Sequence, residues 1–156
     1  MLFYIIDLIR GFHFGRFSAS TALVDGVSGK SYSLAEVRDL SRRLASGLLR
    51  LGCEPGQVVA AILPNVPEYP ILLMAASEAG LVLTTLNPAY TAGEIRGQLA
   101  NSETQVVVTT HQLIDKVQEA IAGTDIKTVV MGDTFGVIGD IPFHTLLADK
   151  GDLVKE

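Results

Sequence analysis

The sequence predicts an α/β fold, a doubly wound and mainly parallel sheet with flanking helices. Short apolar runs alternate with helical stretches, the pattern expected for strands that are buried on both faces of a parallel sheet. The segment 71–94 has the pattern of one full crossover of a parallel sheet: a helix, a helix stop, a buried strand, a turn and the start of the next helix. A length of 156 residues suits one domain with a sizeable core.

A hairpin and a long helix are the first elements expected after residue 20. Segments 21–25 and 30–33 form two strands across the turn 26–29. Ser33 then caps a helix, with Glu36 at the reciprocal capping-box position, and Gly52 ends it. One face of this helix is apolar. It carries Leu34, Val37, Leu40, Leu44, Leu48 and Leu51.

The rest of the core alternates strand and helix. Strands are expected at 57–63, 81–86, 104–109 and 127–131, and helices at 68–79, 92–100 and 112–122. Gly80 closes the helix before the second of these strands. Thr91 and Glu94 have the spacing of a second capping box. We therefore expect an N-terminal helix and lead-in over 1–20, an alternating core over 21–131, and a loop with a short helix over 132–156.

The N-terminal stretch MLFYIIDLIRGFHFGRF is the segment that most resembles a membrane element. Asp7 and Arg10 interrupt its apolar run, which is shorter than the ~20 residues needed to span a bilayer. We expect no transmembrane segment. An amphipathic helix that packs on the body is the preferred interpretation, and a membrane-surface anchor is the alternative. The packing residues are Leu2, Ile5, Ile6 and Ile9.

The amino-acid composition restricts the kinds of partner that this chain is expected to bind. Apolar residues make up 48% of the chain and charged residues 19%, with a mean hydropathy of +0.36, so part of the surface is expected to face further chain or to self-associate. The net charge of −5 and the lack of a Lys/Arg cluster argue against a nucleic-acid partner. Cys53 is the only cysteine, which excludes an internal disulfide and suits a reducing compartment.

Two glycine patterns imitate phosphate-binding motifs. Gly29, Lys30 and Ser31 look like the end of a Walker loop, but Val24 stands where that motif needs its first glycine, and a strand follows instead of a helix. A surface hairpin is the better interpretation. The glycines after the last expected strand, Gly132, Gly136 and Gly139, do not fit the dinucleotide-binding spacing, and a mobile loop is expected there.

The remaining reactive residue types also favour structural roles. The histidines His13, His111 and His144 are far apart and have no metal-ligand spacing. Cys53 lies in a turn with no implied base. Tyr90 and Thr91 follow a strand end, where ligands gather in α/β proteins, although Thr91 has a sufficient role as a helix cap. No catalytic, cofactor-binding or metal-ligating residue is therefore assigned.

Three ordered motifs resemble a known family. They are A-G-x(7)-N-P-x-Y-T-x-x-E from Ala79 to Glu94, the segment YSLAEV at 32–37 preceded by ALVDG at 22–26, and LPN at 63–65 with Glu68. Together they resemble the adenylate-forming, AMP-binding acid–CoA ligases, the relatives of 4-coumarate–CoA ligase, acyl-CoA synthetases and firefly luciferase. Leu34 stands where an aromatic residue is usual. The resemblance extends over roughly 21–127 with the order of elements intact.

This resemblance implies a partial N-terminal domain of an enzyme that uses ATP, Mg and CoA. Such ligases convert a carboxylate into an acyl-adenylate and then into a CoA thioester. The family's phosphate loop, adenine pocket, magnesium ligand and catalytic lysine have no counterpart in this sequence, so the isolated chain is predicted to be inactive and to hold no cofactor. The alternative is a truncated, non-catalytic isoform or interaction module.

The resemblance also implies the partners and the compartment. The implied partners are the rest of the ligase chain and a small carboxylic acid, with aryl, medium-chain and luciferin-like acids all open. A cytoplasmic or peroxisomal location is the family expectation.

Overall fold

The computed structural model describes residues 18–131 and 141–154. The expected N-terminal helix and Gly132, Gly136 and Gly139 lie outside these residues. Within them, the strands are β1 (Thr21–Val24), β2 (Ser31–Ser33), β3 (Val58–Ile62), β4 (Val82–Thr85), β5 (Thr104–Thr110), β6 (Lys127–Met131) and β7 (Ile141–Pro142). The helices are α2 (Leu34–Arg50), α3 (Glu68–Glu78), α4 (Ala92–Asn101), the 3₁₀ turn η1 (His111–Leu113), α5 (Ile114–Ile121) and α6 (Phe143–Leu147).

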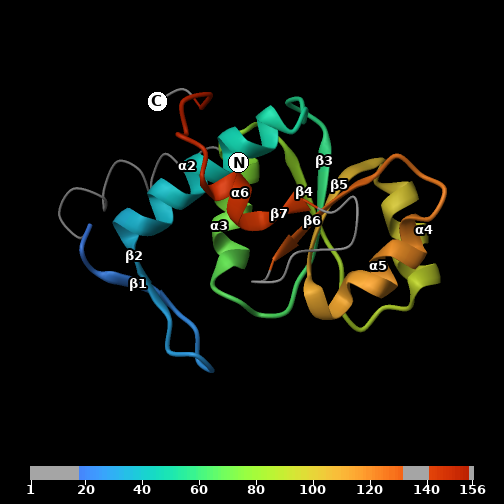
Figure 1. Ribbon diagram of the computed structural model, residues 1–156, viewed down its shortest axis with the longest axis horizontal. Coiled ribbons are helices and arrows are strands. Elements are labelled where there is room, and N and C mark those ends of the chain that lie inside the picture. The colour runs from blue at the N-terminus through green and yellow to red at the C-terminus, as the bar shows by residue number, and fades with distance from the viewer. Residues whose placement is uncertain (1–17, 132–140, 155–156) are drawn as a thin grey trace.

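Five of the strands form one parallel sheet in the order β4-β3-β5-β6-β7. The chain moves from β3 outward to β4, returns to the other side of β3 with β5, and continues to β6 and β7. The winding direction therefore reverses between β3 and β5, which confirms the doubly wound sheet. Strands β1 and β2 form a separate antiparallel hairpin that projects from the body beside α2 (Figure 1).

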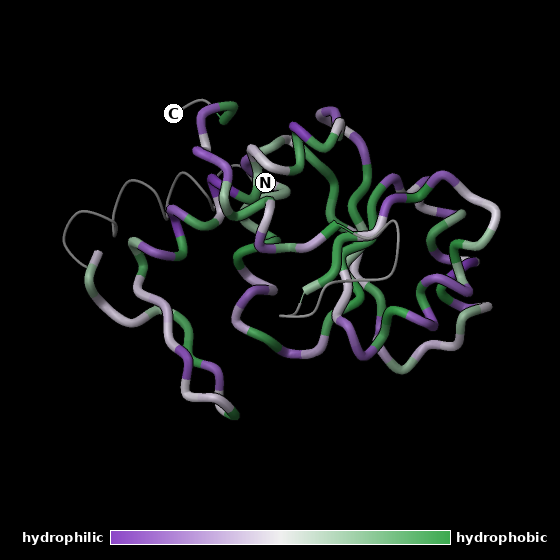
Figure 2. The backbone as a smooth tube through the Cα atoms, viewed as in Figure 1, coloured by the Kyte–Doolittle hydropathy of each residue, from purple (hydrophilic) through white to green (hydrophobic). Residues whose placement is uncertain are grey.

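Helices cover both faces of the sheet, as doubly wound folds require. On one face α2, α3 and α6 pack over side chains such as Val59, Val106 and Val129. On the other face α4 and α5 cover a smaller cluster that includes Ile62 and Val107. Figure 2 shows the hydrophobic colour concentrated along the central strands, whereas hydrophilic residues alternate along the outer helices. Among the described residues, none of the helices is long and apolar enough to cross a membrane.

Both expected capping boxes are present. Ser33 Oγ accepts a hydrogen bond from the Glu36 N–H at 3.2 Å, and Glu36 Oε2 accepts one from the Ser33 N–H at 2.7 Å. Thr91 and Glu94 repeat this arrangement at the start of α4. The reciprocal bonds satisfy backbone donors that a helix N-terminus otherwise leaves unpaired. They also hold the pKa of each glutamate below its ordinary value, because the backbone N–H bonds favour the ionised carboxyl.

Ser33→Ala is expected to lower the free energy of unfolding by ~1 kcal/mol, because the first turn of α2 loses its side-chain acceptor. Chemical denaturation measures the change. Ser77→Ala is the matched control: Ser77 lies inside α3, where its hydroxyl bonds the Leu73 carbonyl, so this substitution is expected to cost less than ~0.5 kcal/mol. Equal costs for the two variants would contradict a capping role for Ser33.

One expectation about the strands is wrong for β4. The sequence predicts burial on both faces, but Val82 is 51% exposed and Thr85 is also exposed. The reason is position: β4 is the edge strand of the sheet, so it has only one neighbouring strand among the described residues. The central strands β3, β5 and β6 are buried as expected.

Candidate functional site

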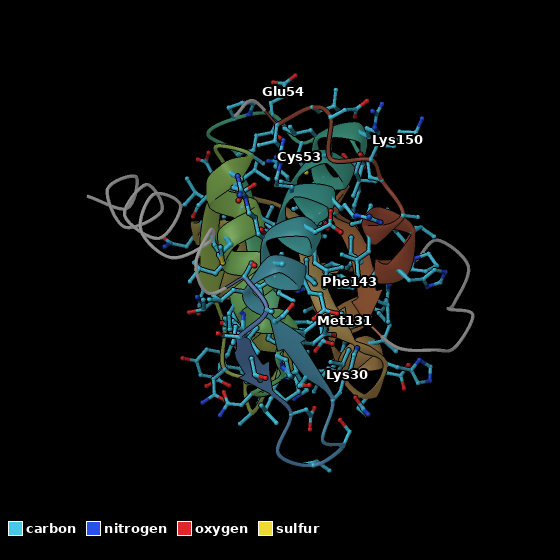
Figure 3. The ribbon with its side chains drawn as sticks, turned by 90° about the vertical axis from the view of Figure 1, so that its left-hand side faces the viewer. Lys30, Cys53, Glu54, Met131, Phe143 and Lys150 are labelled. Atoms are coloured by element: carbon cyan, nitrogen blue, oxygen red, sulfur yellow. The ribbon has the colours of Figure 1, made fainter. Side chains whose placement is uncertain are left out.

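A cavity of ≈ 420 Å³ lies where β3, β5 and β6 end. Pro64 follows β3, Thr110 ends β5, and Met131 ends β6, so three carboxyl ends of parallel strands meet at its floor. The winding of the sheet reverses between β3 and β5, and α/β proteins bind ligands at this kind of position. We call this space the switch-point cavity. Figure 3 labels Lys30, Met131 and Phe143, which follow one another along this side of the molecule.

The cavity is lined by both polar and apolar residues. Lys30, Tyr32 and Glu68 come from the hairpin and the first turn of α3, and Gln112 and His144 lie in η1 and α6. The apolar lining consists of Pro64, Val66, Met131, Phe143 and Leu147. Apolar walls with a few convergent polar groups are the usual composition of small-molecule sites.

Glu68 is the centre of a hydrogen-bonded group in the lining of the cavity. Its Oε1 accepts a hydrogen bond from the Tyr32 hydroxyl at 2.6 Å and another from Lys30 Nζ at 3.1 Å. Lys30 Nζ also lies 4.9 Å from the centre of the Tyr32 ring. Burial alone raises the pKa of the Glu68 carboxyl, but hydrogen bonds from Tyr32, its own backbone N–H and Lys30 outweigh that effect and bring the pKa below its ordinary value. Glu68 is therefore a carboxylate at neutral pH.

Thr110 places an unpaired hydroxyl in the wall of the cavity. The residue is 7% exposed, and its Oγ1 is buried with no hydrogen-bond partner. The neighbouring Thr109, on the other face of the sheet, donates its hydroxyl to the Ile62 carbonyl at 3.1 Å. Buried polar atoms are nearly always bonded, so this unpaired hydroxyl is an exception among the residues that line the cavity.

Tyr32→Phe is expected to lower the free energy of unfolding by ~1 kcal/mol at neutral pH, because the Glu68 carboxylate loses a hydrogen-bond donor. The pKa of Glu68 is depressed in the folded protein, so the stabilisation is present above the ordinary carboxyl value of 4.5 and is lost as the pH falls through the depressed pKa. Denaturation at neutral and at acidic pH measures both parts.

Tyr90→Phe is the control for this pair, because Tyr90 packs against the opposite face of the sheet. We expect little change in that variant at either pH. A cost for Tyr32→Phe that persists at acidic pH would contradict the bond to an ionised Glu68.

The hairpin turn is no phosphate site. The N–H groups of Val27 and Ser28 already donate to Asp25 Oδ1, at 2.8 and 2.9 Å, and the Gly29 N–H donates to the Asp25 carbonyl at 2.9 Å. The Asp25 carboxylate and carbonyl thus take the amides that a phosphate would need, and the bonds from the Ser28 and Val27 N–H groups to the carboxylate hold the pKa of Asp25 below its ordinary value. Lys30 is bonded to Glu68. These groups of the turn are therefore not available to the phosphates of ATP, and the segment folds as the expected hairpin.

His13 lies outside the described residues, and of the other sequence candidates that the structure describes, all but one lie apart from the cavity. Thr91 caps α4, and Tyr90 packs beside it. His111 is exposed in η1, whereas His144, for which the sequence predicted no ligand role, lines the switch-point cavity. In the described residues no group of three His, Cys, Asp or Glu side chains is arranged to hold a metal ion. Burial raises the pKa of the Cys53 thiol, as expected for a structural cysteine.

Comparison with known proteins gives the chain its family. The family model described as "AMP-binding enzyme" matches residues 13–150, most of the sequence. The chain belongs to the AMP-binding enzyme family. This confirms the resemblance identified from the three motifs.

The relatives of this AMP-binding chain include plant enzymes. It is 37% identical over 130 residues to 4-coumarate–CoA ligase 3 of Oryza sativa subsp. japonica, which covers 83% of the chain and 23% of that ligase. It is 39% identical over 108 residues to 4-coumarate–CoA ligase CCL1 of Humulus lupulus, covering 69% of the chain and 20% of that ligase. The chain thus spans about a fifth to a quarter of the length of these relatives.

Solved structures share the fold of this AMP-binding chain. A benzoate CoA ligase from Burkholderia xenovorans LB400 superimposes with a TM-score of 0.78 at 21% identity, covering 93% of the chain and 27% of that structure. A red-emitting luciferase from Phrixothrix hirtus gives a TM-score of 0.77 at 20% identity, covering 92% of the chain and 34% of that structure.

Two of the sequence motifs are in contact in the structure, which their separation along the sequence did not predict. Tyr32 belongs to the YSLAEV segment, and Glu68 follows the LPN segment, 36 positions later. The structure joins these two motif residues by a hydrogen bond at the cavity. Thr110 carried no sequence signal, since a threonine at the end of an apolar strand is ordinary.

Proposed function

We propose that this chain forms the N-terminal part of an ATP-dependent acid–CoA ligase. The observation that carries the proposal is the identity of 37% to a 4-coumarate–CoA ligase over 83% of the chain. The position of the switch-point cavity at the carboxyl ends of the strands supports a role beside a small-molecule site. The proposed partners are the remainder of a ligase and a small carboxylic acid, and the proposed compartment is the cytoplasm or the peroxisome.

In the proposed reaction, a carboxylate oxygen attacks the α-phosphorus of ATP and releases pyrophosphate, and the CoA thiol then displaces AMP from the acyl-adenylate. Mg would offset the phosphate charge. The amides of the hairpin turn are bonded to Asp25, and Lys30 is bonded to Glu68, so we assign none of these steps to these residues. The chain's proposed contribution is a folded platform, and the chain alone is expected to be inactive.

ATP–pyrophosphate exchange tests this proposal in two arms. The isolated chain is expected to stay at background with a panel of aromatic and medium-chain acids. A chimera in which this chain replaces the matched segment of the rice 4-coumarate–CoA ligase 3 is expected to retain exchange and CoA-dependent thioester formation. The aromatic acids come first in the panel because the relatives are named for 4-coumarate and benzoate.

The same chimera carrying Leu44→Ala is the control for folding. Loss of ATP–pyrophosphate exchange in that variant would show that the activity depends on the folded state of this chain. ATP–pyrophosphate exchange by the isolated chain would contradict the proposal that this chain is inactive without the rest of the ligase. A soluble, folded chimera that binds ATP but shows no exchange would contradict the proposed ligase platform and favour a non-catalytic module.

A further inference from the structure

Part of the wall of the switch-point cavity belongs to α6, a helix of only five residues. Phe143, His144 and Leu147 of α6 line the cavity. A helix this short has little stability of its own, because its first turn fixes several backbone dihedrals for one hydrogen bond. Its N-cap residue, Pro142, makes no side-chain capping bond. The position of this wall therefore depends on contacts with the rest of the molecule.

The α6 segment, which we define as residues 143–154, lies along the second half of α2 (Figure 3). At Gly47 the two backbones are so close that an added Cβ would lie 2.9 Å from the Leu146 Cα. At Gly151 an added Cβ would lie 3.4 Å from the backbone carbonyl carbon of Arg42. The segment thus rests on the helix backbone at two points, and both contacts depend on a glycine.

The polar attachment of the α6 segment runs to one side of α2. Arg50 Nε donates to Asp149 Oδ2 at 2.6 Å, and Arg50 Nη2 donates to Asp152 Oδ1 at 2.5 Å. One turn earlier in α2, Ser46 Oγ accepts a hydrogen bond from the Leu153 N–H at 2.9 Å. Residues four positions apart in a helix lie on the same side, so Ser46 and Arg50 hold the segment together.

Arg50 is the charged residue of this attachment. Its side chain is 50% exposed, and its two partners, Asp149 and Asp152, are 9% and 56% exposed. The other oxygen of Asp149 accepts a hydrogen bond from the Gly151 N–H at 3.0 Å, so one carboxylate joins the turn of the segment to α2. Ion pairs that solvent reaches are weak and are screened by salt. The attachment is therefore expected to weaken as the ionic strength rises.

We propose that the α6 segment is a lid of the switch-point cavity, which opens as a unit when the Arg50 ion pairs break, while the central sheet stays folded. Proteins open locally in contiguous units that have few buried contacts and solvent-exposed bonds. The α6 segment follows β7, a two-residue strand at the edge of the sheet, and α2 holds it through exposed ion pairs. Opening removes Phe143 and Leu147 from the lining of the cavity and gives solutes access to Thr110.

The opposite arrangement is a fixed wall, which separates from α2 only when the whole protein unfolds. The group formed by Lys30, Tyr32 and Glu68 gives the cavity a second wall that is held by its own hydrogen bonds, so opening of α6 leaves that wall in place. The inference goes beyond the proposed ligase activity and does not depend on it.

Hydrogen exchange of the full chain at low urea concentrations tests whether the lid opens separately. Amides of 143–154 are expected to exchange at least about tenfold faster than those of β5, and with a smaller dependence on urea, because local opening exposes less surface than global unfolding. In Arg50→Met the exchange of 143–154 is expected to be about three to ten times faster than in the parent. Arg43→Met is the matched control, because it removes the Arg43–Asp39 ion pair on the same helix and is expected to leave that exchange unchanged. Exchange of 143–154 at the rate of β5, with the same urea dependence, overturns the proposal.

Thiol labelling tests whether this opening gives access to the cavity. In a Cys53→Ala background, Thr110→Cys places the only thiol in the lining of the cavity, and Val107→Cys places it in the core on the other face of the sheet. The cysteine at 110 is expected to react with a soluble disulfide reagent at least about tenfold faster than the cysteine at 107, which requires global unfolding. Raising the salt from about 0.05 to 1 M should speed labelling at 110 in the parent and have little further effect in Arg50→Met.

The salt comparison in the parent needs no substitution at Arg50, so it stands even if Arg50→Met fails to fold. Labelling at 110 that neither salt nor Arg50→Met changes would show that reagents enter without movement of α6, and it overturns the proposal. Equal labelling rates at 110 and 107 would show that both sites open only by global unfolding, and they overturn it as well.

Discussion

Leu44→Ala is expected to lower the free energy of unfolding by about 2 to 5 kcal/mol, because it leaves a cavity in the larger core cluster. Leu44 lies in the middle of α2, has no exposed surface, and belongs to the cluster formed with α3, α6 and the sheet. The neighbouring helices are fixed by packing on both sides, so the space left by the missing atoms collapses only in part. Chemical denaturation with an unchanged m-value measures the effect.

Leu73→Ala is the matched control for this prediction. Leu73 lies on the outer side of α3 and is 44% exposed, so the same change in atoms removes little buried area. We expect a cost below ~1 kcal/mol for that variant. Similar losses in the two variants would mean that the apolar face of α2 is not the face that contacts the sheet.

The periodicity of apolar residues in the sequence correctly predicted that Leu44 is buried, because a helix with one apolar face packs against a sheet through that face. Val37 and Leu48, also expected on that face, are buried, whereas Leu40 and Leu51 are only partly buried. The burial of Ser41 and Ala45 was not expected, since neither residue is a strong apolar signal. They are buried because α3 packs beside α2: Ser41 Oγ donates to the Arg38 carbonyl and lies 3.4 Å from Glu78 Oε1 on α3. Such packing is decided by tertiary contacts.

The switch-point cavity also depends on tertiary contacts that local sequence patterns do not predict. The strand order that creates it depends on β5 returning past β3, and a list of alternating strands and helices is compatible with several orders. Tyr32 and Glu68 were visible as members of motifs, but their hydrogen bond joins two elements whose relative position no local pattern encodes. The capping boxes were predictable because both partners lie within one helical turn.

Gly47→Ala is expected to destabilise the protein by about 1 to 3 kcal/mol, although alanine is the better helix former by ~1 kcal/mol. A Cβ atom at this position of α2 would lie 2.8 Å from the Leu146 carbonyl oxygen and 2.9 Å from the Leu146 Cα. These are backbone atoms of α6, so the short helix itself has to move. The following segment is tied to α2 by the Arg50–Asp149 ion pair and by the hydrogen bond from the Leu153 N–H to Ser46 Oγ at 2.9 Å. Displacing α6 strains both.

Gly97→Ala is the matched control, and it is expected to change the stability in the opposite direction. Gly97 lies inside α4, and a Cβ added there meets nothing within 4 Å, so only the gain in helix propensity is felt. We expect stabilisation by about 0.4 to 1 kcal/mol. The two variants make the same chemical change in two helices, which isolates the contact between α2 and α6. In Gly47→Ala, hydrogen exchange should also speed up within the segment 141–154 and leave α4 unchanged. Stabilisation by both alanines would show that α6 does not rest against Gly47 in solution.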